Sequence, residues 1–134
     1  MFSTFNNFIT YKLNKTNLLS DIMNINYSDK DSISIIHISG RIDGNNSSAV
    51  EEELNSVLRT GKKLILIDLS GVDYISSSGL RVFLTTLKKI KSFNGKMKLS
   101  GLKPFVMSVF TISGFTNLFE IYENCDTAYQ SFSE

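Results

Sequence analysis

The sequence contains one cysteine, one proline, one histidine and no tryptophan in 134 residues. The lone Cys125 excludes an internal disulfide and a cysteine-based metal site, which fits a reducing compartment. No run of about 18 apolar residues is present, so no membrane-spanning helix is expected. The N-terminus lacks a basic segment followed by a continuous apolar run, so no signal peptide is predicted. These absences favour the cytoplasm.

An excess of charge of one sign is also missing. The 14 Lys and Arg residues almost balance the 13 Asp and Glu residues, and both signs are spread along the chain. We therefore expect neither direct binding of nucleic acid nor insertion into or adhesion to an anionic membrane. The length and the 42% hydrophobic content suit one globular domain.

Residues 1–22 are the least regular part of the chain. Their apolar side chains, Phe2, Phe5, Phe8 and Ile9, are scattered among Asn, Thr and Ser. They could form an amphipathic turn or a loosely attached tail. We expect an N-terminal extension over residues 1–22 and a compact domain over residues 23–134.

Strand and helix patterns alternate in the second part of the chain. The expected strands cover residues 24–28, 33–39, 64–67, 96–100 and 119–122. The expected helices run from a cap at Asn46, Ser47 or Ser48 to Gly61, from Ser78 to about Phe93, from Pro104 to Gly114, and from Cys125 to Phe132. The strand at 96–100 should be half-exposed, with Met97 and Leu99 inward. No helix separates the first two strands, so they should be antiparallel within a mixed α/β sheet.

The most informative stretch runs from residue 64 to residue 84. An apolar strand (LILI) comes first, residues 68–73 have turn-prone composition, and Ser76, Ser77, Ser78 and Gly79 precede a helical pattern. Helix capping by one of the serines is the simplest interpretation. The position is also notable, because sites in open α/β sheets lie at the carboxyl ends of strands.

Three kinds of catalytic or ligand site are not supported. A serine hydrolase needs a nearby base, and the only histidine, His37, lies in an isoleucine-rich strand and is interpreted as structural. The nucleophile-elbow pattern fails because Ile75 stands where its first glycine should be. A phosphate-binding loop would need more glycines and a lysine. Asp43, Asp68 and Asp73 are scattered turn acids, so no metal and no cofactor are expected.

A hydroxyl exposed at a helix N-terminus can nevertheless accept a phosphoryl group. The free N–H groups and the helix dipole would partly stabilise the new charge. A partner that docks there would meet added bulk and charge. The serine cluster therefore suggests an interaction switch in which this chain is a substrate and performs no catalysis.

The segment from residue 66 to residue 81, LIDLSGVDYISSSGLR, resembles the signature of bacterial STAS-domain proteins, the anti-sigma factor antagonists. The GRID sequence at residues 40–43 and the order of elements from residue 24 to the C-terminus are similar too. The resemblance implies a mixed sheet of about five strands with about four helices. The family motif is commonly Asp-Ser-Ser-Gly, and Ser76 stands here in place of the aspartate.

The resemblance also implies partners and a modified residue. Members of the family bind an anti-sigma factor that is also a serine kinase of the histidine-kinase-like ATPase type. The kinase phosphorylates the antagonist, and a PP2C-type phosphatase reverses the reaction. Ser77 matches the modified serine, with Ser76 and Ser78 as competing acceptors. The expected partner-binding residues are Asp43, Ser76, Ser77, Ser78, Gly79 and Arg81.

Two other functions remain open on the sequence. Stand-alone STAS domains also serve as constitutive interaction subunits of lipid-transport or stress-signalling assemblies, without a phosphorylation switch. A serine or nucleotide hydrolase is the third possibility, and the missing base and phosphate loop argue against it.

Overall fold

The computed structural model describes the backbone of residues 11–12 and all of residues 23–133. Five strands and four helices lie in the second of these ranges, and they alternate from β3 onward. The strands are β2 (Met23–Lys30), β3 (Ile33–Ile42), β4 (Leu64–Ile75), β5 (Lys96–Ser100) and β6 (Glu120–Tyr122). The helices are α1 (Ser47–Arg59), α2 (Ser77–Ser92), α3 (Pro104–Ile112) and α4 (Cys125–Ser131), with a 3₁₀ turn, η3 (Phe115–Asn117), after α3.

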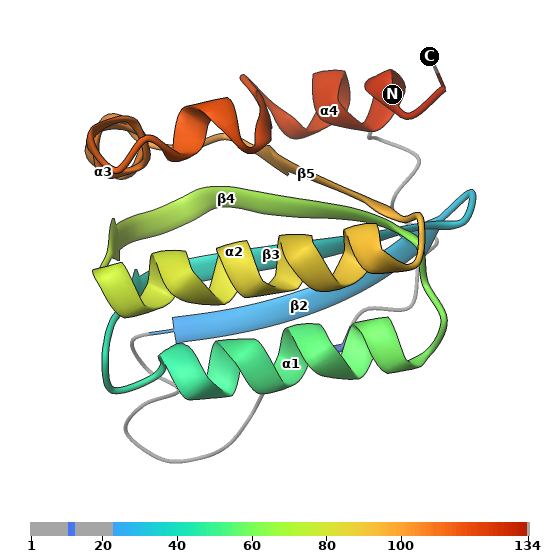
Figure 1. The fold of residues 1–134 in the computed structure, drawn as a ribbon, viewed down its shortest axis with the longest axis horizontal. Helices are drawn as coiled ribbons and strands as arrows, with labels where there is room; N and C mark the ends of the chain where they lie inside the picture. The colour runs from blue at the N-terminus through green and yellow to red at the C-terminus, as the bar shows by residue number, and fades with distance from the viewer. Residues whose placement is uncertain (1–10, 13–22, 134) are drawn as a thin grey trace.

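The strands form one mixed sheet in sequence order. Strands β2 and β3 are antiparallel, whereas β3, β4, β5 and β6 are parallel to one another. A two-residue strand, β1 (Tyr11–Lys12), pairs with the outer edge of β2. Helices α1 and α2 lie on one side of the sheet and α3 and α4 on the other (Figure 1). The predicted α/β class, mixed sheet and helix count are confirmed.

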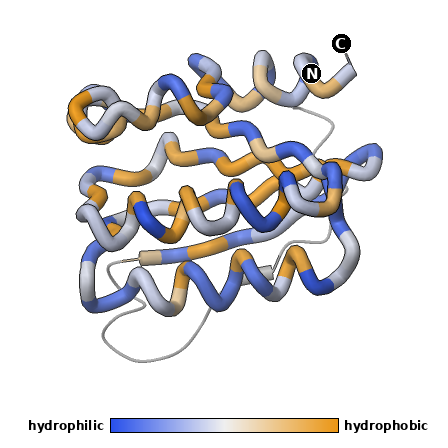
Figure 2. The backbone as a smooth tube through the Cα atoms, in the orientation of Figure 1, coloured by the Kyte–Doolittle hydropathy of each residue, from blue (hydrophilic) through white to orange (hydrophobic). Residues whose placement is uncertain are grey.

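The isoleucine-rich strand β3 is buried because both of its faces are covered. Ile36 and Ile38 belong to the main core, together with Val50 of α1 and Phe83 of α2. Ile35, on the opposite face, packs in a smaller cluster under α4. A strand covered on both faces reads as a continuous apolar run, which is why the pattern predicted this strand and its start correctly. Its end was misplaced, because β3 continues three residues beyond Ser39 to Ile42. The apolar residues gather on the inward sides of the elements (Figure 2).

The predicted turn at residues 68–73 is wrong, because β4 continues through it to Ile75. Strands β3 and β4 stay paired there by means of register shifts between His37 and Ser39 and between Gly40 and Arg41. In this part of β4 every third residue, Leu69, Val72 and Ile75, is buried, and the residues between them are mostly polar or glycine. This composition is the one expected of a turn. Helix α2 therefore follows the end of β4 almost directly.

Two smaller expectations also need correction. Met97 and Leu99 are buried as predicted, but Lys98 is buried as well, so β5 is not half-exposed. The Lys98 ammonium donates a hydrogen bond to Ser131 Oγ at 2.7 Å and lies 4.5 Å from the centre of the Phe132 ring. Strand β2 extends two residues beyond its predicted end at Ser28. Apart from β1, the predicted extension 1–22 lies outside the described residues, so its boundary stays a prediction.

Candidate functional site

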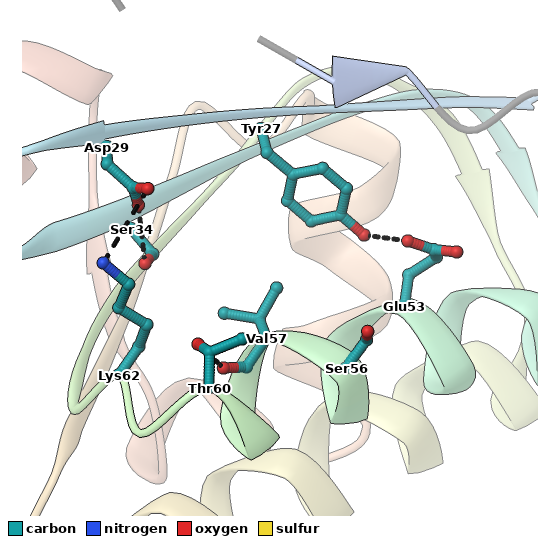
Figure 3. A pocket seen from close by; sticks show the side chains of 8 residues that line it. All are labelled: Tyr27, Asp29, Ser34, Glu53, Ser56, Val57, Thr60 and Lys62. Atoms are coloured by element: carbon teal, nitrogen blue, oxygen red, sulfur yellow. Dashed lines mark hydrogen bonds and ion pairs between the residues drawn. The ribbon is translucent and has the colours of Figure 1, made fainter. Parts of the chain in front are cut away.

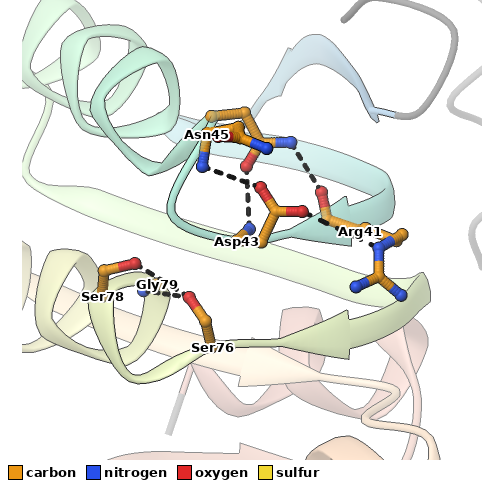
Figure 4. Close-up of polar contacts among 7 residues, drawn as sticks. Arg41, Asp43, Asn45, Ser76, Ser78 and Gly79 are labelled. Atoms are coloured by element: carbon orange, nitrogen blue, oxygen red, sulfur yellow. Dashed lines mark hydrogen bonds and ion pairs between the residues drawn. The ribbon is translucent and has the colours of Figure 1, made fainter.

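The candidate site lies where β4 ends and α2 begins, beside the loop from β3 to α1. The backbone N–H of Ser76 donates a hydrogen bond to the carbonyl oxygen of Ile42 at 2.9 Å, which ties these two chain segments together. Figure 4 shows the serine turn and the loop that carries Asp43 facing each other. Asp43 and the serine cluster, far apart in sequence, are thus brought to one edge of the sheet, as the family resemblance implied.

Ser76 is the N-terminal cap of α2. Its Oγ atom accepts a hydrogen bond from the backbone N–H of Gly79 at 3.2 Å. The same hydroxyl lies 2.8 Å from the Ser78 hydroxyl, so the two side chains share a hydrogen bond. A serine here fills the capping role that an aspartate would have, since both side chains accept from the same backbone position. The departure from the family motif therefore leaves the helix start intact.

Ser77 is the first residue of α2, and its side chain is exposed. Its neighbours Ser76 and Ser78 are partly buried and bonded to each other. Ser77 makes no side-chain hydrogen bond to any other described residue. Arg81 is exposed one turn further along α2, so it lies on the same side of the helix as Ser77.

Gly79 is buried because the helix start packs tightly on the sheet. A Cβ atom at this position would lie 2.8 Å from Cγ2 of Ile42 and 2.9 Å from Cγ1 of Ile75. Both distances are shorter than real carbon–carbon contacts, so only glycine fits. Gly79 thus sets the position of the serine turn against β3 and β4.

The loop after β3 is held by Asx hydrogen bonds. Asp43 Oδ1 accepts from the Asn45 N–H and Asn46 Oδ1 accepts from the Asp43 N–H, both at 2.9 Å. The buried Asn46 also donates through Nδ2 to the Arg41 carbonyl oxygen at 2.8 Å. Asn46 occupies the N-cap position of α1 as predicted, but its side chain caps nothing there. Turn formation accounts for Asp43, as the sequence already suggested.

An aromatic contact that sequence reasoning missed extends the site towards α3. The Arg41 guanidinium lies 4.2 Å from the centre of the Tyr74 ring, and Tyr74 stacks on Phe105 with ring centres 5.8 Å apart. Arg41 Nε is also 3.7 Å from Asp43 Oδ2. The alternation of residues along β4 could have placed Tyr74 at the surface, but nothing in the sequence pairs it with Arg41.

His37 is engaged away from the serine turn. Its Nδ1 atom lies 2.8 Å from Asp68 Oδ2 on the neighbouring strand. Burial raises the pKa of Asp68, but hydrogen bonds from His37 and Ser70 outweigh it and hold the pKa below its ordinary value. No set of three His, Cys, Asp or Glu residues suited to a metal ion occurs within the described part of the chain.

A hollow of about 250 Å³ lies elsewhere, between β2, β3 and the C-terminal half of α1 (Figure 3). Tyr27 donates a hydrogen bond to Glu53 across it. Burial, followed by the hydrogen bond and negative charge of Glu53, raises the pKa of Tyr27. None of the predicted site residues lines this hollow, so it is separate from the serine turn.

The STAS-domain family model matches residues 24–128. The chain belongs to the STAS-domain family. BtrV of Bordetella bronchiseptica, named as a candidate anti-sigma factor antagonist, is 35% identical to this STAS protein over 102 residues, 76% of this chain and 88% of BtrV. The anti-sigma-B factor antagonist of Bacillus subtilis is 34% identical over 101 residues, 74% of this chain and 92% of the relative.

The fold agrees with solved structures of the family. The crystal structure of an anti-sigma factor antagonist from Mycobacterium paratuberculosis is similar with a TM-score of 0.79 and 24% identity, over 85% of this chain and 97% of that one. This similarity supports the fold of the STAS domain. Among the residues that the structure describes, no helix is long and apolar enough to cross a membrane.

Proposed function

We propose that this STAS protein is an anti-sigma factor antagonist that is switched by phosphorylation of Ser77. In the unphosphorylated state it binds an anti-sigma factor that is also a serine kinase of the histidine-kinase-like ATPase type. Phosphorylation at Ser77 releases the complex, and a PP2C-type phosphatase restores binding. The names of the relatives support antagonism of an anti-sigma factor. The proposed setting is the cytoplasm.

The observation that best supports the switch is that the three serines differ in their contacts. Ser76 and Ser78 bond to each other, and Ser76 also caps the helix, whereas the Ser77 side chain is exposed. A kinase can therefore reach Ser77 without opening any intramolecular hydrogen bond of its side chain. The competing acceptors would have to give up bonds that hold the start of α2.

The same geometry explains how a phosphate could act without unfolding the domain. The phosphate would sit at the first residue of α2, where backbone N–H groups and the helix dipole favour negative charge. The fold would change little, but a surface that fitted the neutral hydroxyl would meet a bulky dianion. Asp43 and Arg81 flank the turn and are proposed to contact the partner. The chain needs no catalytic residue for this role.

The test is phosphorylation by the anti-sigma factor kinase of the same organism, with ATP, followed by mapping of the phosphate by mass spectrometry. Ser77→Ala should abolish the modification and retain kinase binding, whereas the matched variant Ser78→Ala should still be modified. Phosphate found on Ser76 or Ser78 in the wild-type protein would refute the assignment. Stable binding with no phosphorylation at all would favour a constitutive interaction subunit.

A further inference from the structure

Helix α3 and the turn after it form the longest uncharged segment of the chain. Residues 104–119 contain no Asp, Glu, Lys, Arg or His, although 20% of the whole sequence is Asp, Glu, Lys or Arg. Val106 and Phe110 bury one face of α3 in the main core. The opposite face of such a helix is normally polar and charged, as it is on α1 and α2. The absence of charge on α3 is therefore not explained by its contribution to the core.

The outward side of α3 carries large apolar side chains beside the exposed Ser108 and Thr111. Ile112 is 85% exposed and Phe105 is 52% exposed, and a separation of seven residues places them on the same side of the helix. Leu118, just after η3, is 48% exposed, and these three are the exposed large hydrophobic residues of the described chain. The apolar colouring of α3 is visible in Figure 2.

The two polar side chains of α3 donate hydrogen bonds to the backbone of their own helix. The Ser108 hydroxyl donates to the Phe105 carbonyl oxygen at 2.6 Å, and the Thr111 hydroxyl donates to the Met107 carbonyl oxygen at 2.9 Å. Their hydrogen-bonding capacity is thus partly used within the helix. Depletion of charge together with exposed Phe and aliphatic side chains is the composition of the core of a protein interface.

This face is continuous with the serine site. Phe105 stacks on Tyr74, and the Arg41 guanidinium lies over the other part of this contact, the Tyr74 ring. Arg41 in turn forms an ion pair with Asp43 beside the serine turn. The charges along this path already have partners within the chain, since Lys103 Nζ also lies 2.5 Å from Asp73 Oδ1. A protein that covers the path therefore needs an apolar counterpart for α3 and does not need to supply compensating charge.

We propose that the outward face of α3, formed by Phe105 and Ile112, is a second docking surface for the same kinase that binds at Ser77. The inference rests on the proposed function. The kinase places an apolar patch on α3 and its active site over Ser77. The α3 contact supplies affinity in every state, and Ser77 supplies the switch.

The test uses Ile112→Asp and Ile112→Ala in the full chain, with Gln130→Asp as the matched control. Gln130 is exposed on α4 and receives the same charge at a different part of the surface. Since Ile112 is so exposed, all three proteins should unfold at the urea midpoint of the wild type. Calorimetric titration with the purified kinase should show at least a tenfold loss of affinity for Ile112→Asp, a smaller loss for Ile112→Ala and none for the control.

Phosphorylation kinetics separate docking from chemistry. Ile112→Asp should raise the KM for this protein about tenfold and leave kcat unchanged, because Ser77 itself is untouched. If the kinase binds the wild type and binds Ile112→Asp with the same affinity, the α3 docking surface is overturned and the proposed function still stands. Failure of the wild type to bind the kinase would overturn the proposed function itself. Wild-type dimers in sedimentation that Ile112→Asp converts to monomers would show that a second copy covers this face, which also overturns the inference.

Discussion

The Oγ atom of Ser76 accepts a hydrogen bond from the backbone N–H of Gly79 and shares a second hydrogen bond with Ser78. This pair of contacts fixes the first turn of α2 and leaves the intervening Ser77 hydroxyl exposed. The capping residue and the proposed acceptor for phosphate are thus adjacent residues with separate roles. The consequences of that separation can be measured.

Loss of the cap should destabilise the domain. Ser76→Ala removes the acceptor for the Gly79 N–H and is expected to lower the free energy of unfolding by about 1 kcal/mol. Ser76→Asp should retain the cap and gain from the helix dipole. Ser77→Ala is the control and should stay within about 0.5 kcal/mol of the wild type. Urea denaturation measures all three, and an equal loss in Ser77→Ala would contradict the separate roles.

Gly79 should not tolerate even a methyl group. Gly79→Ala would place Cβ within 2.9 Å of Ile42 and Ile75 side chains, so the start of α2 must move. The overpacking is expected to cost about 1–3 kcal/mol, which outweighs the better helix propensity of alanine, worth about 1 kcal/mol. Gly44→Ala is the control, because nothing lies within 4 Å of a Cβ atom there. Equal urea midpoints for the two variants would disprove the close packing.

Asp68 should make stability depend on acid pH. Its pKa in the folded protein lies below its ordinary value of about 3.9, because its hydrogen bonds with His37 and Ser70 outweigh burial. The folded state therefore binds the proton less readily than the unfolded state. The resulting stabilisation is complete above the unfolded pKa and is lost as pH falls through the folded pKa.

The measurement is the titration of the Asp68 carboxyl carbon by NMR, alongside urea midpoints between about pH 6 and pH 2. His37→Ala should move the Asp68 pKa upward by removing one hydrogen bond. Asp68→Asn should flatten the acid side of the stability profile. A carboxyl that titrates at its ordinary pKa in the wild type would refute the role of the His37 contact.

Cys125 should be a poorly reactive thiol. Burial and then the negative charge of Asp68 raise its pKa to about 12. At pH 8 only about one thiol in ten thousand would be ionised, and the thiolate is the reactive form. Reaction with Ellman's reagent should be slow in the folded protein and fast in urea. Equal rates in the two conditions would contradict the shielding of Cys125.

The sequence predicted the fold well where an element is built from the residue types that are typical of it. The isoleucines of β3, the leucines and isoleucines at the start of β4, and Gly114 after α3 each mark an element that the structure confirms. The failure at residues 68–73 arose because Asp, Ser and Gly occupy a strand whose pairing with β3 is irregular. Composition cannot reveal a bulge that depends on a second strand.

The candidate site was predictable in its residues but not in its contacts. The serine run and Gly79 were visible in the sequence, and the family resemblance implied that Asp43 would lie beside them. The sharing of a hydrogen bond by Ser76 and Ser78, the clash that requires Gly79, and the stacking of Arg41, Tyr74 and Phe105 all depend on three-dimensional distances. The burial of Lys98 was missed for the same reason, because its aromatic and hydroxyl partners come from β6 and from the end of the chain.

The most direct test of the switch compares the affinity of the purified anti-sigma factor kinase for this protein before and after phosphorylation at Ser77. Calorimetric titration should show binding of the unphosphorylated protein and at least a tenfold weaker affinity for the protein that carries phosphate on Ser77. Ser77→Ala should bind like the unphosphorylated wild type and stay bound in the presence of ATP. Equal affinities for the two forms of the wild-type protein would contradict the account.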